Sequence, residues 1–379
     1  MEQNKKERFI FLDGIRGIMS INVVICHFIV VYYPAMYFEE FASTYPLQSI
    51  VATTPLSVFV NGNIAVQYFF VLAGFLTAYT LFHSAPYDLK GIIRRIIKRY
   101  FRFLPIVACA IIFTFLLMKN NLLFHLDIAE ITKNPSFIQN YCYFTPTING
   151  MLTDIFINTF IKGSNYVGPF WTIHYEFWGQ AICLVICTLL RKNKTRRIFY
   201  PLLAVVVTVF IDYNFLPFFI GVFVADLICF PEKDATVLSK HYFCILGHKS
   251  FISIISVIGV YFACVPMYFV GIYSFWGKIP LLFPTLLRSI GTGILLFVLF
   301  KTPNLQKFFE HKAFQFLGKL SFPIYAFHWT LMLSLQSWLF KILSSNQAYD
   351  VSALFSFGIT CIVTLILAYL IWFSLERKK

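Results

Sequence analysis

The stretch FLDGIRGIMSINVVICHF, residues 11–28, lies in a long apolar run near the start of the chain. Its length predicts a membrane-spanning helix over residues 13–33. Arg16 and His27 are 11 positions apart in it. On an α-helix this spacing is about three turns, so both side chains share one face, roughly 16 Å apart. Ionisable groups inside a membrane segment are costly, so both residues are functional candidates.

The composition of the whole chain indicates a membrane protein. Of 379 residues, 59% are hydrophobic, 19% are aromatic and only 13% are charged. One or two soluble cores could not bury so much apolar surface. We therefore expect an all-α fold, a polytopic transmembrane helix bundle that forms a single membrane domain over residues 1–379.

Hydropathy and loop composition predict about ten spans. We place them at residues 13–33, 64–83, 103–119, 170–190, 198–212, 216–230, 251–270, 281–300, 321–343 and 352–373. The sizeable piece outside these spans is the segment 120–169, in which an amphipathic helix is predicted near 150–162.

The basic residues fall in loops that share one side of a ten-span chain. Both termini are therefore predicted to be cytoplasmic by the positive-inside rule. We interpret the net charge of +14 as topology and contact with membrane lipids, and not as nucleic-acid binding. We expect an integral protein of the bacterial cytoplasmic membrane. The basic residues are Lys5, Lys6, Arg8, Lys90, Arg94, Arg95, Lys98, Arg99, Arg102, Arg191, Lys192, Lys194, Arg196, Arg197, Lys307, Lys312, Lys319, Arg377, Lys378 and Lys379.

The ionisable residues of the first helix allow two interpretations each. Asp13 and Arg16 are three apart and can pair on one helical turn. They could equally be an interfacial anchor, with Arg16 extended toward the headgroups. His27 could serve as a general base, because imidazole titrates near neutrality. A structural hydrogen bond within the bundle is the alternative.

Five motifs, in order along nearly the whole chain, resemble those of the acyltransferase 3 family. The first is the Arg-x10-His pattern of Arg16 and His27. The others are NGNIAVQYFFVLAGFL (61–76), RRIIKRYFRFLP (94–105), GPFWTIHYEFWG (168–179) and LGKLSFPIYAFHW (317–329). The chain departs from the family patterns at Ala73, which replaces Ser, at Phe322, which replaces Tyr, and in having the single acid Glu176.

The resemblance implies a membrane enzyme that O-acylates carbohydrates and other hydroxylated acceptors. It implies His27 as general base, with a covalent acyl-histidine as the alternative. Glu176 would orient an imidazole or hold a sugar hydroxyl. We expect acyl-CoA, and acetyl-CoA in particular, as the co-substrate, with no permanently bound cofactor and no metal.

The remaining site residues divide between donor and acceptor. We expect the donor phosphates near the cytoplasmic face, since guanidinium groups match phosphate oxygens, whereas the arginines could instead only set orientation or bind anionic lipid. Residues expected to bind the donor are Arg16, Arg99, Arg102 and His328. Residues expected to bind the substrate are Trp171, Asp13 and Tyr325, although Trp171 could belong to the aromatic belt of the membrane interface.

The expected acceptor is a cell-surface or lipid-linked glycan, with segment 120–169 as a possible acceptor-side element. Two other classes of function compete with this prediction. One is a transporter or flippase for an anionic or polyprenyl-linked solute, although we see no internal repeat of the kind that transporters often carry. The other is a non-enzymatic lipid-binding or signalling protein.

Overall fold

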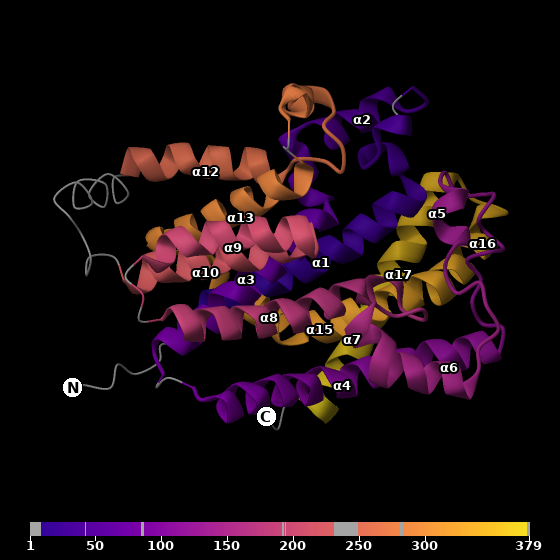
Figure 1. Cartoon of the computed structure of the whole chain (residues 1–379). Coiled ribbons are helices and arrows are strands. Elements are labelled where there is room, and N and C mark those ends of the chain that lie inside the picture. Colours follow the sequence, from indigo (N-terminus) through magenta and orange to yellow (C-terminus); the bar gives the residue numbers. More distant parts are fainter. Residues whose placement is uncertain are drawn as a thin grey trace.

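The computed structural model describes residues 9–41, 43–84, 87–191, 193, 195–230, 249–280 and 283–376. These residues form helices and no strands (Figure 1). Several basic residues used to orient the chain lie outside the described residues: Lys5, Lys6, Arg8, Lys192, Lys194, Arg377, Lys378 and Lys379. The all-helical prediction is thus confirmed for the described part of the chain.

Each predicted span contains a helix. They are α1 (Ile10–Tyr32), α3 (Gly62–Phe82), α4 (Leu89–Lys119), α8 (Trp171–Leu190), α9 (Arg196–Phe210), α10 (Leu216–Cys229), α12 (Lys249–Ala263), α13 (Pro284–Lys301), α15 (Lys312–Leu331) with its continuation through η8 (Met332–Gln336) into α16 (Ser337–Ser344), and α17 (Tyr349–Leu375). Six helical segments are long and apolar enough to cross a membrane, namely α1, α3, α4, Gly168–Leu190, α13 and α17. The count of ten spans and the side of the termini stay predictions.

Two helices begin well before the predicted spans, and one ends early. The basic residues before the third span continue the helix, so α4 begins at Leu89, where the Asp88 carboxylate accepts a hydrogen bond from Gly91 N at 2.8 Å. The helix α15 begins at Lys312. The helix α12 ends at Ala263, shortly before Pro266, which lacks the N–H that a helix needs.

The helices α1 and α15 pack in parallel with their backbones in contact. A Cβ atom added at Gly17 would lie 2.6 Å from Gly318 N, and one added at Gly318 would overlap the Asp13 carbonyl oxygen. Only glycine allows so close an approach. His27 and His328 follow ten residues after Gly17 and Gly318, respectively, so the same register carries the two histidines to one level.

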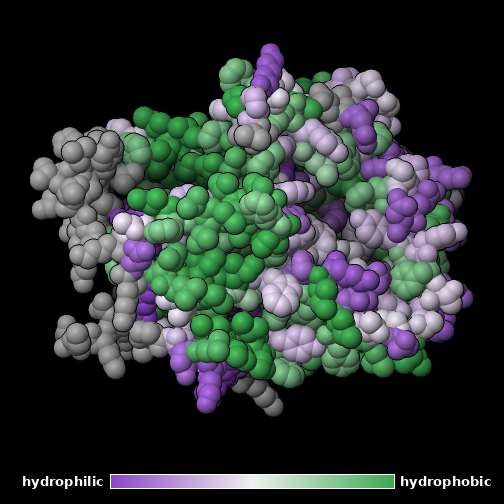
Figure 2. Space-filling view, viewed as in Figure 1, coloured by the Kyte–Doolittle hydropathy of each residue, from purple (hydrophilic) through white to green (hydrophobic). Residues whose placement is uncertain are grey.

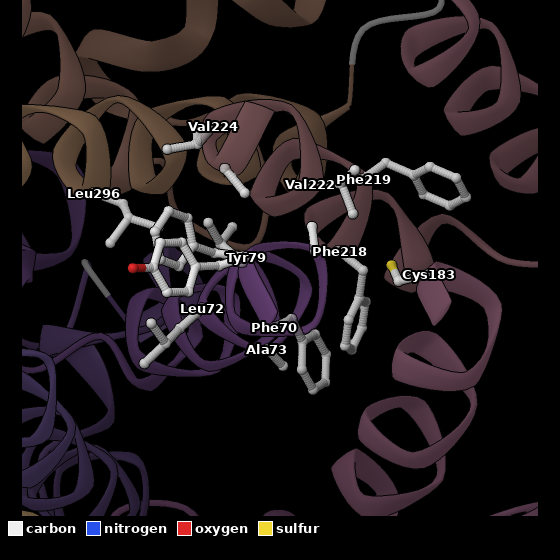
Figure 3. Close-up of a cluster of buried hydrophobic side chains, with 14 of the residues drawn as sticks. Phe70, Leu72, Ala73, Tyr79, Cys183, Phe218, Phe219, Val222, Val224 and Leu296 are labelled. Atoms are coloured by element: carbon white, nitrogen blue, oxygen red, sulfur yellow. The ribbon is translucent and has the colours of Figure 1, made fainter. Parts of the chain in front are cut away.

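A cluster of buried apolar residues joins α3 to α8 and α10 (Figure 3). The rings of Phe70 and Phe218 stack with centroids 4.9 Å apart, and Cys183 of α8 lies beside them. Ala73, which stands where the family pattern has Ser, is buried in this cluster. Its methyl group therefore contributes to packing between the helices.

Apolar side chains also cover much of the outside of the bundle, as expected for a surface that faces lipid. Figure 2 shows hydrophobic residues over the face of α8, α9 and α12, with hydrophilic residues gathered at the end where α16 lies. On α9, Val209 and Phe210 are 67% and 81% exposed. Such exposure would be costly in water.

The short helices of segment 120–169 lie at one end of the bundle, on the right in Figure 1. They include the predicted amphipathic helix, which runs without a break through α6, η4 and α7. The short elements at this end and elsewhere in the described residues are η1 (Pro34–Met36), η2 (Glu39–Phe41), α2 (Pro46–Thr53), η3 (Pro55–Phe59), α5 (Pro135–Gln139), α6 (Ile148–Thr153), η4 (Asp154–Asn158), α7 (Thr159–Ile161), η5 (Gly168–Phe170), η6 (Tyr213–Phe215), η7 (Gly271–Lys278) and α14 (Pro303–Phe309).

Segment 120–169 is fastened to the helices that carry the histidines. Asn134 Nδ2 donates to Val30 O of α1 at 3.0 Å, and Phe124 N donates to Leu333 O of η8 at 3.0 Å. Within the segment, the buried Asp154 carboxylate accepts hydrogen bonds from the Ser164 hydroxyl and from Asn165 N. The segment is therefore an ordered wall beside α1 and η8.

Candidate active site

Two histidines from distant parts of the chain meet between α1 and α15. His27 Nδ1 and His328 Nε2 are 3.0 Å apart. His328 is only 2% exposed, whereas His27 keeps part of its surface accessible. His27 is therefore the more exposed of the two residues.

His328 differs in position from the sequence-based expectation. We expected it on the inner half of a helix beginning near residue 321, close to the donor. Because α15 begins at Lys312, His328 lies near the C-terminal end of that helix and at the level of His27. Its other ring nitrogen, Nδ1, lies 3.1 Å from Ile324 O and 2.8 Å from Tyr325 O. Each nitrogen of His328 therefore has a protein partner.

An aromatic wall covers the histidine pair on the side of segment 120–169. The Trp329 ring lies edge-on to His27 with centroids 4.9 Å apart, and Tyr141 contacts Trp329 at 4.5 Å. Sequence analysis overlooked Trp329, although it directly follows His328. The wall connects segment 120–169 to the ring of the candidate base.

A second polar cluster surrounds Glu176 on α8. Arg16 of α1 and Arg99 and Arg102 of α4 all act electrostatically on its carboxylate, and Gln180, one turn later, donates to Glu176 Oε1 at 3.2 Å. Sequence analysis expected Glu176 beside an imidazole or a sugar. Among the described residues, Gln180 is the hydrogen-bond partner of Glu176, the arginines and Tyr325 interact with it electrostatically over a longer range, and neither histidine of the pair contacts it.

The cationic residues of this cluster are accessible to different degrees. Arg99 is half-buried and Arg102 is exposed. Arg16 Nη1 lies 3.7 Å from Asp13 Oδ1, which confirms the pair predicted on one turn of the first helix. Three guanidinium groups against the two carboxylates of Asp13 and Glu176 leave a net positive charge, which suits an anionic ligand.

Tyr325 ties the helix of His328 to the start of α8. Its hydroxyl donates to Pro169 O and lies 2.6 Å from Thr172 Oγ1. The side chain is 9% exposed. Through these contacts, Tyr325 links the helix of His328 to the helix of Glu176. The sequence did not identify Thr172 as the partner of Tyr325.

Trp171, predicted to contact substrate, begins α8 at the surface. It is 40% exposed, and its ring lies edge-on to Tyr175 with centroids 5.7 Å apart. A flat, exposed indole of this kind is available to a sugar ring or to the membrane interface. Its role as a substrate contact stays a prediction.

Gln180 was also overlooked by sequence analysis, and a signal for it existed. It follows Glu176 by four residues, which is the spacing at which two helical side chains meet. The arginines around Glu176 come from α1 and α4, so no local pattern could have placed them there.

The fold and these clusters define a membrane-embedded helical protein with polar groups inside its bundle. Residues 9–373, nearly the whole chain, match the model of an acyltransferase domain. The chain therefore belongs to the acyltransferase 3 family, as its motifs predicted. This membership supports a membrane acyltransferase in general. No curated protein and no solved structure matches the chain.

Proposed function

We propose that this protein transfers an acetyl group from cytoplasmic acetyl-CoA to a hydroxyl of a carbohydrate acceptor, a cell-surface or lipid-linked glycan. The observation that carries the proposal is the histidine pair, in which Nδ1 of the half-buried His27 lies 3.0 Å from Nε2 of the buried His328. Because the chain belongs to the acyltransferase family, we assign this pair to acyl transfer.

In the proposed reaction, His27 acts as general base through Nε2. It takes the proton of the acceptor hydroxyl while the hydroxyl oxygen attacks the thioester carbonyl carbon. The carbon–sulfur bond then breaks, and the coenzyme A thiolate takes the proton from His27. Atoms and charges balance, and the imidazole returns to its neutral state.

The proposed donor site is the cluster of Arg16, Arg99 and Arg102. Guanidinium groups bind phosphate oxygens in pairs, and the exposure of Arg102 gives the nucleotide end of the donor a first contact. The electrostatic interaction of all three with Glu176 supports their assignment to one site. The pantetheine arm would then carry the thioester from this cluster toward His27.

The proposed acceptor side is segment 120–169 together with Trp171. The contact of Tyr141 with Trp329, and of Trp329 with His27, links this segment to the base. Trp171 offers an exposed aromatic face of the kind that sugar rings stack on.

The test compares His27→Gln with His83→Gln. His83 caps the C-terminal end of α3, and its Nδ1 lies 2.9 Å from Tyr79 O, outside the proposed site. Cells that produce each variant are supplied with isotope-labelled acetate, and surface glycans are analysed by mass spectrometry for acetyl esters. Membrane insertion is checked by size-exclusion chromatography of the purified variants.

We expect His27→Gln to lower glycan acetylation about 100-fold or more, as loss of a general base does, and His83→Gln to retain it. Full acetylation by a correctly inserted His27→Gln would refute the proposal. Loss of an exported solute without any change in acetyl esters would instead identify a transporter.

A further inference from the structure

We propose that His328 is a positioning residue that holds His27 in the tautomer with its proton on Nδ1, and so leaves His27 Nε2 free to accept a proton. The inference deepens the proposed acyl transfer and rests on it for its function. The tautomer itself follows from the hydrogen-bond geometry.

The proton positions can be assigned from the carbonyl groups around His328. A carbonyl oxygen only accepts hydrogen bonds, and His328 Nδ1 lies 2.8 Å from Tyr325 O and 3.1 Å from Ile324 O. His328 Nδ1 therefore carries a proton and donates it. In a neutral ring, His328 Nε2 then has a lone pair and accepts.

The lone pair on His328 Nε2 determines which ring nitrogen of His27 carries the proton. Because His27 Nδ1 lies 3.0 Å from that lone pair, it carries the proton and donates it. In neutral His27, the remaining nitrogen, Nε2, is unprotonated, as a general base requires.

The pair thereby performs with a neutral group what a carboxylate does in a Ser-His-Asp triad. It fixes the tautomer and the orientation of the ring. When His27 takes a proton, its Nδ1–H bond to His328 becomes charge-assisted and stronger. In the part of the chain that the structure describes, no hydrogen bond or ion pair joins a carboxylate to either ring, so this role falls to His328.

The first test reads the tautomer directly. The full chain, labelled with 15N-histidine and reconstituted in lipid, is examined by solid-state NMR at neutral pH, with the His27→Gln variant used to assign the His27 signals among eight histidines. We expect a protonated Nδ1 and a bare Nε2 on His27. A His27 with its proton on Nε2 would overturn the proposal.

The second test uses a matched pair of substitutions. The His328→Gln side chain reaches the position of Nε2 with an oxygen that accepts a hydrogen bond. The His328→Met side chain has similar length and fills the same space, but accepts one only weakly. We expect His328→Met to lower glycan acetylation about 10–100-fold, as loss of an orienting partner does, and His328→Gln to restore much of it.

The two readouts separate this inference from the proposed function. In His328→Met we also expect the NMR spectrum of His27 to change from one tautomer to a mixture. If wild-type protein shows the predicted tautomer but no acetylation, the proposed function is wrong and the positioning of His27 stands. Equal acetylation and an unchanged His27 spectrum in His328→Met would refute the positioning role.

Discussion

His27 Nδ1 lies 3.0 Å from His328 Nε2, and the two residues are 301 positions apart, the same separation as Gly17 and Gly318. The close approach of the two glycines and the meeting of the two histidines are thus parts of one register. The packing of α1 on α15 is therefore a precondition of the proposed chemistry and not only of stability.

We expect Gly17→Ala to disturb both the packing of α1 on α15 and the contact between the two histidines. Its Cβ atom would meet the backbone of Gly318 at 2.6 Å, so the helices must move apart. Such overpacking typically costs about 1–3 kcal/mol, and the displacement would lengthen the histidine contact. The unfolding temperature in detergent and the extent of glycan acetylation should both decrease. The control is Gly358→Ala, where nothing lies within 4 Å of the new atom; an equal loss there would contradict the argument.

Arg99→Ala should weaken binding of the donor. A hydrogen bond to a charged group contributes about 1.5–3 kcal/mol, so we expect the KM for acetyl-CoA to increase about 10–100-fold, with a smaller change in kcat. Arg94→Ala is the matched control, because Arg94 lies on the same helix but is exposed and is not among the groups that act on Glu176. Similar effects of both substitutions would indicate that α4 only attracts anions in general.

Glu176→Gln should have the opposite effect on donor binding. The carboxylate partly neutralises Arg16, Arg99 and Arg102, so its removal leaves the cluster more positive at nearly the same volume. Coenzyme A binding, measured by isothermal titration calorimetry, should become tighter, while thermal stability decreases because like charges are left uncompensated. Weaker binding of coenzyme A would instead place Glu176 on the ligand itself.

The sequence alone predicted the helical class, the location of most helices and the Asp13–Arg16 pair, because these depend on local periodicity and on apolar run length. It did not predict the partner of His27. The basic, partly polar residues at the start of α15 concealed nine residues of that helix, from Lys312 to the predicted start at residue 321.

The surroundings of Glu176 show a second limit of local patterns. Its contact with Gln180 follows from helical spacing. The electrostatic influence of the three arginines comes from α1 and α4 and depends on how those helices pack around α8. Periodicity describes one helix at a time. It contains no information on the register between helices that are distant in the chain.

The last prediction concerns His125 in the segment that lies over the site. Its Nε2 lies 2.9 Å from Tyr141 O, its Nδ1 is buried without a hydrogen-bond partner, and its side chain is 2% exposed. Burial lowers the pKa of His125 below the ordinary value for histidine. When the segment opens, His125 regains its ordinary pKa of about 6.5 and takes up a proton more readily.

Acid should therefore favour the open segment. The contribution of His125 to the stability of the closed segment is fully present above a pH of about 6.5. It is lost as the pH falls toward the lowered pKa, by about 1.4 kcal/mol for each unit that separates the two pKa values. Hydrogen–deuterium exchange over residues 122–145 should accelerate between about pH 7.5 and pH 5 after correction for intrinsic rates. The His125→Gln variant keeps a donor for the Tyr141 carbonyl but cannot titrate, so its exchange should depend less on pH. Because Tyr141 contacts Trp329 beside His27, opening should also lower acetylation in acid, and an unchanged pH dependence in His125→Gln would assign the effect to another group.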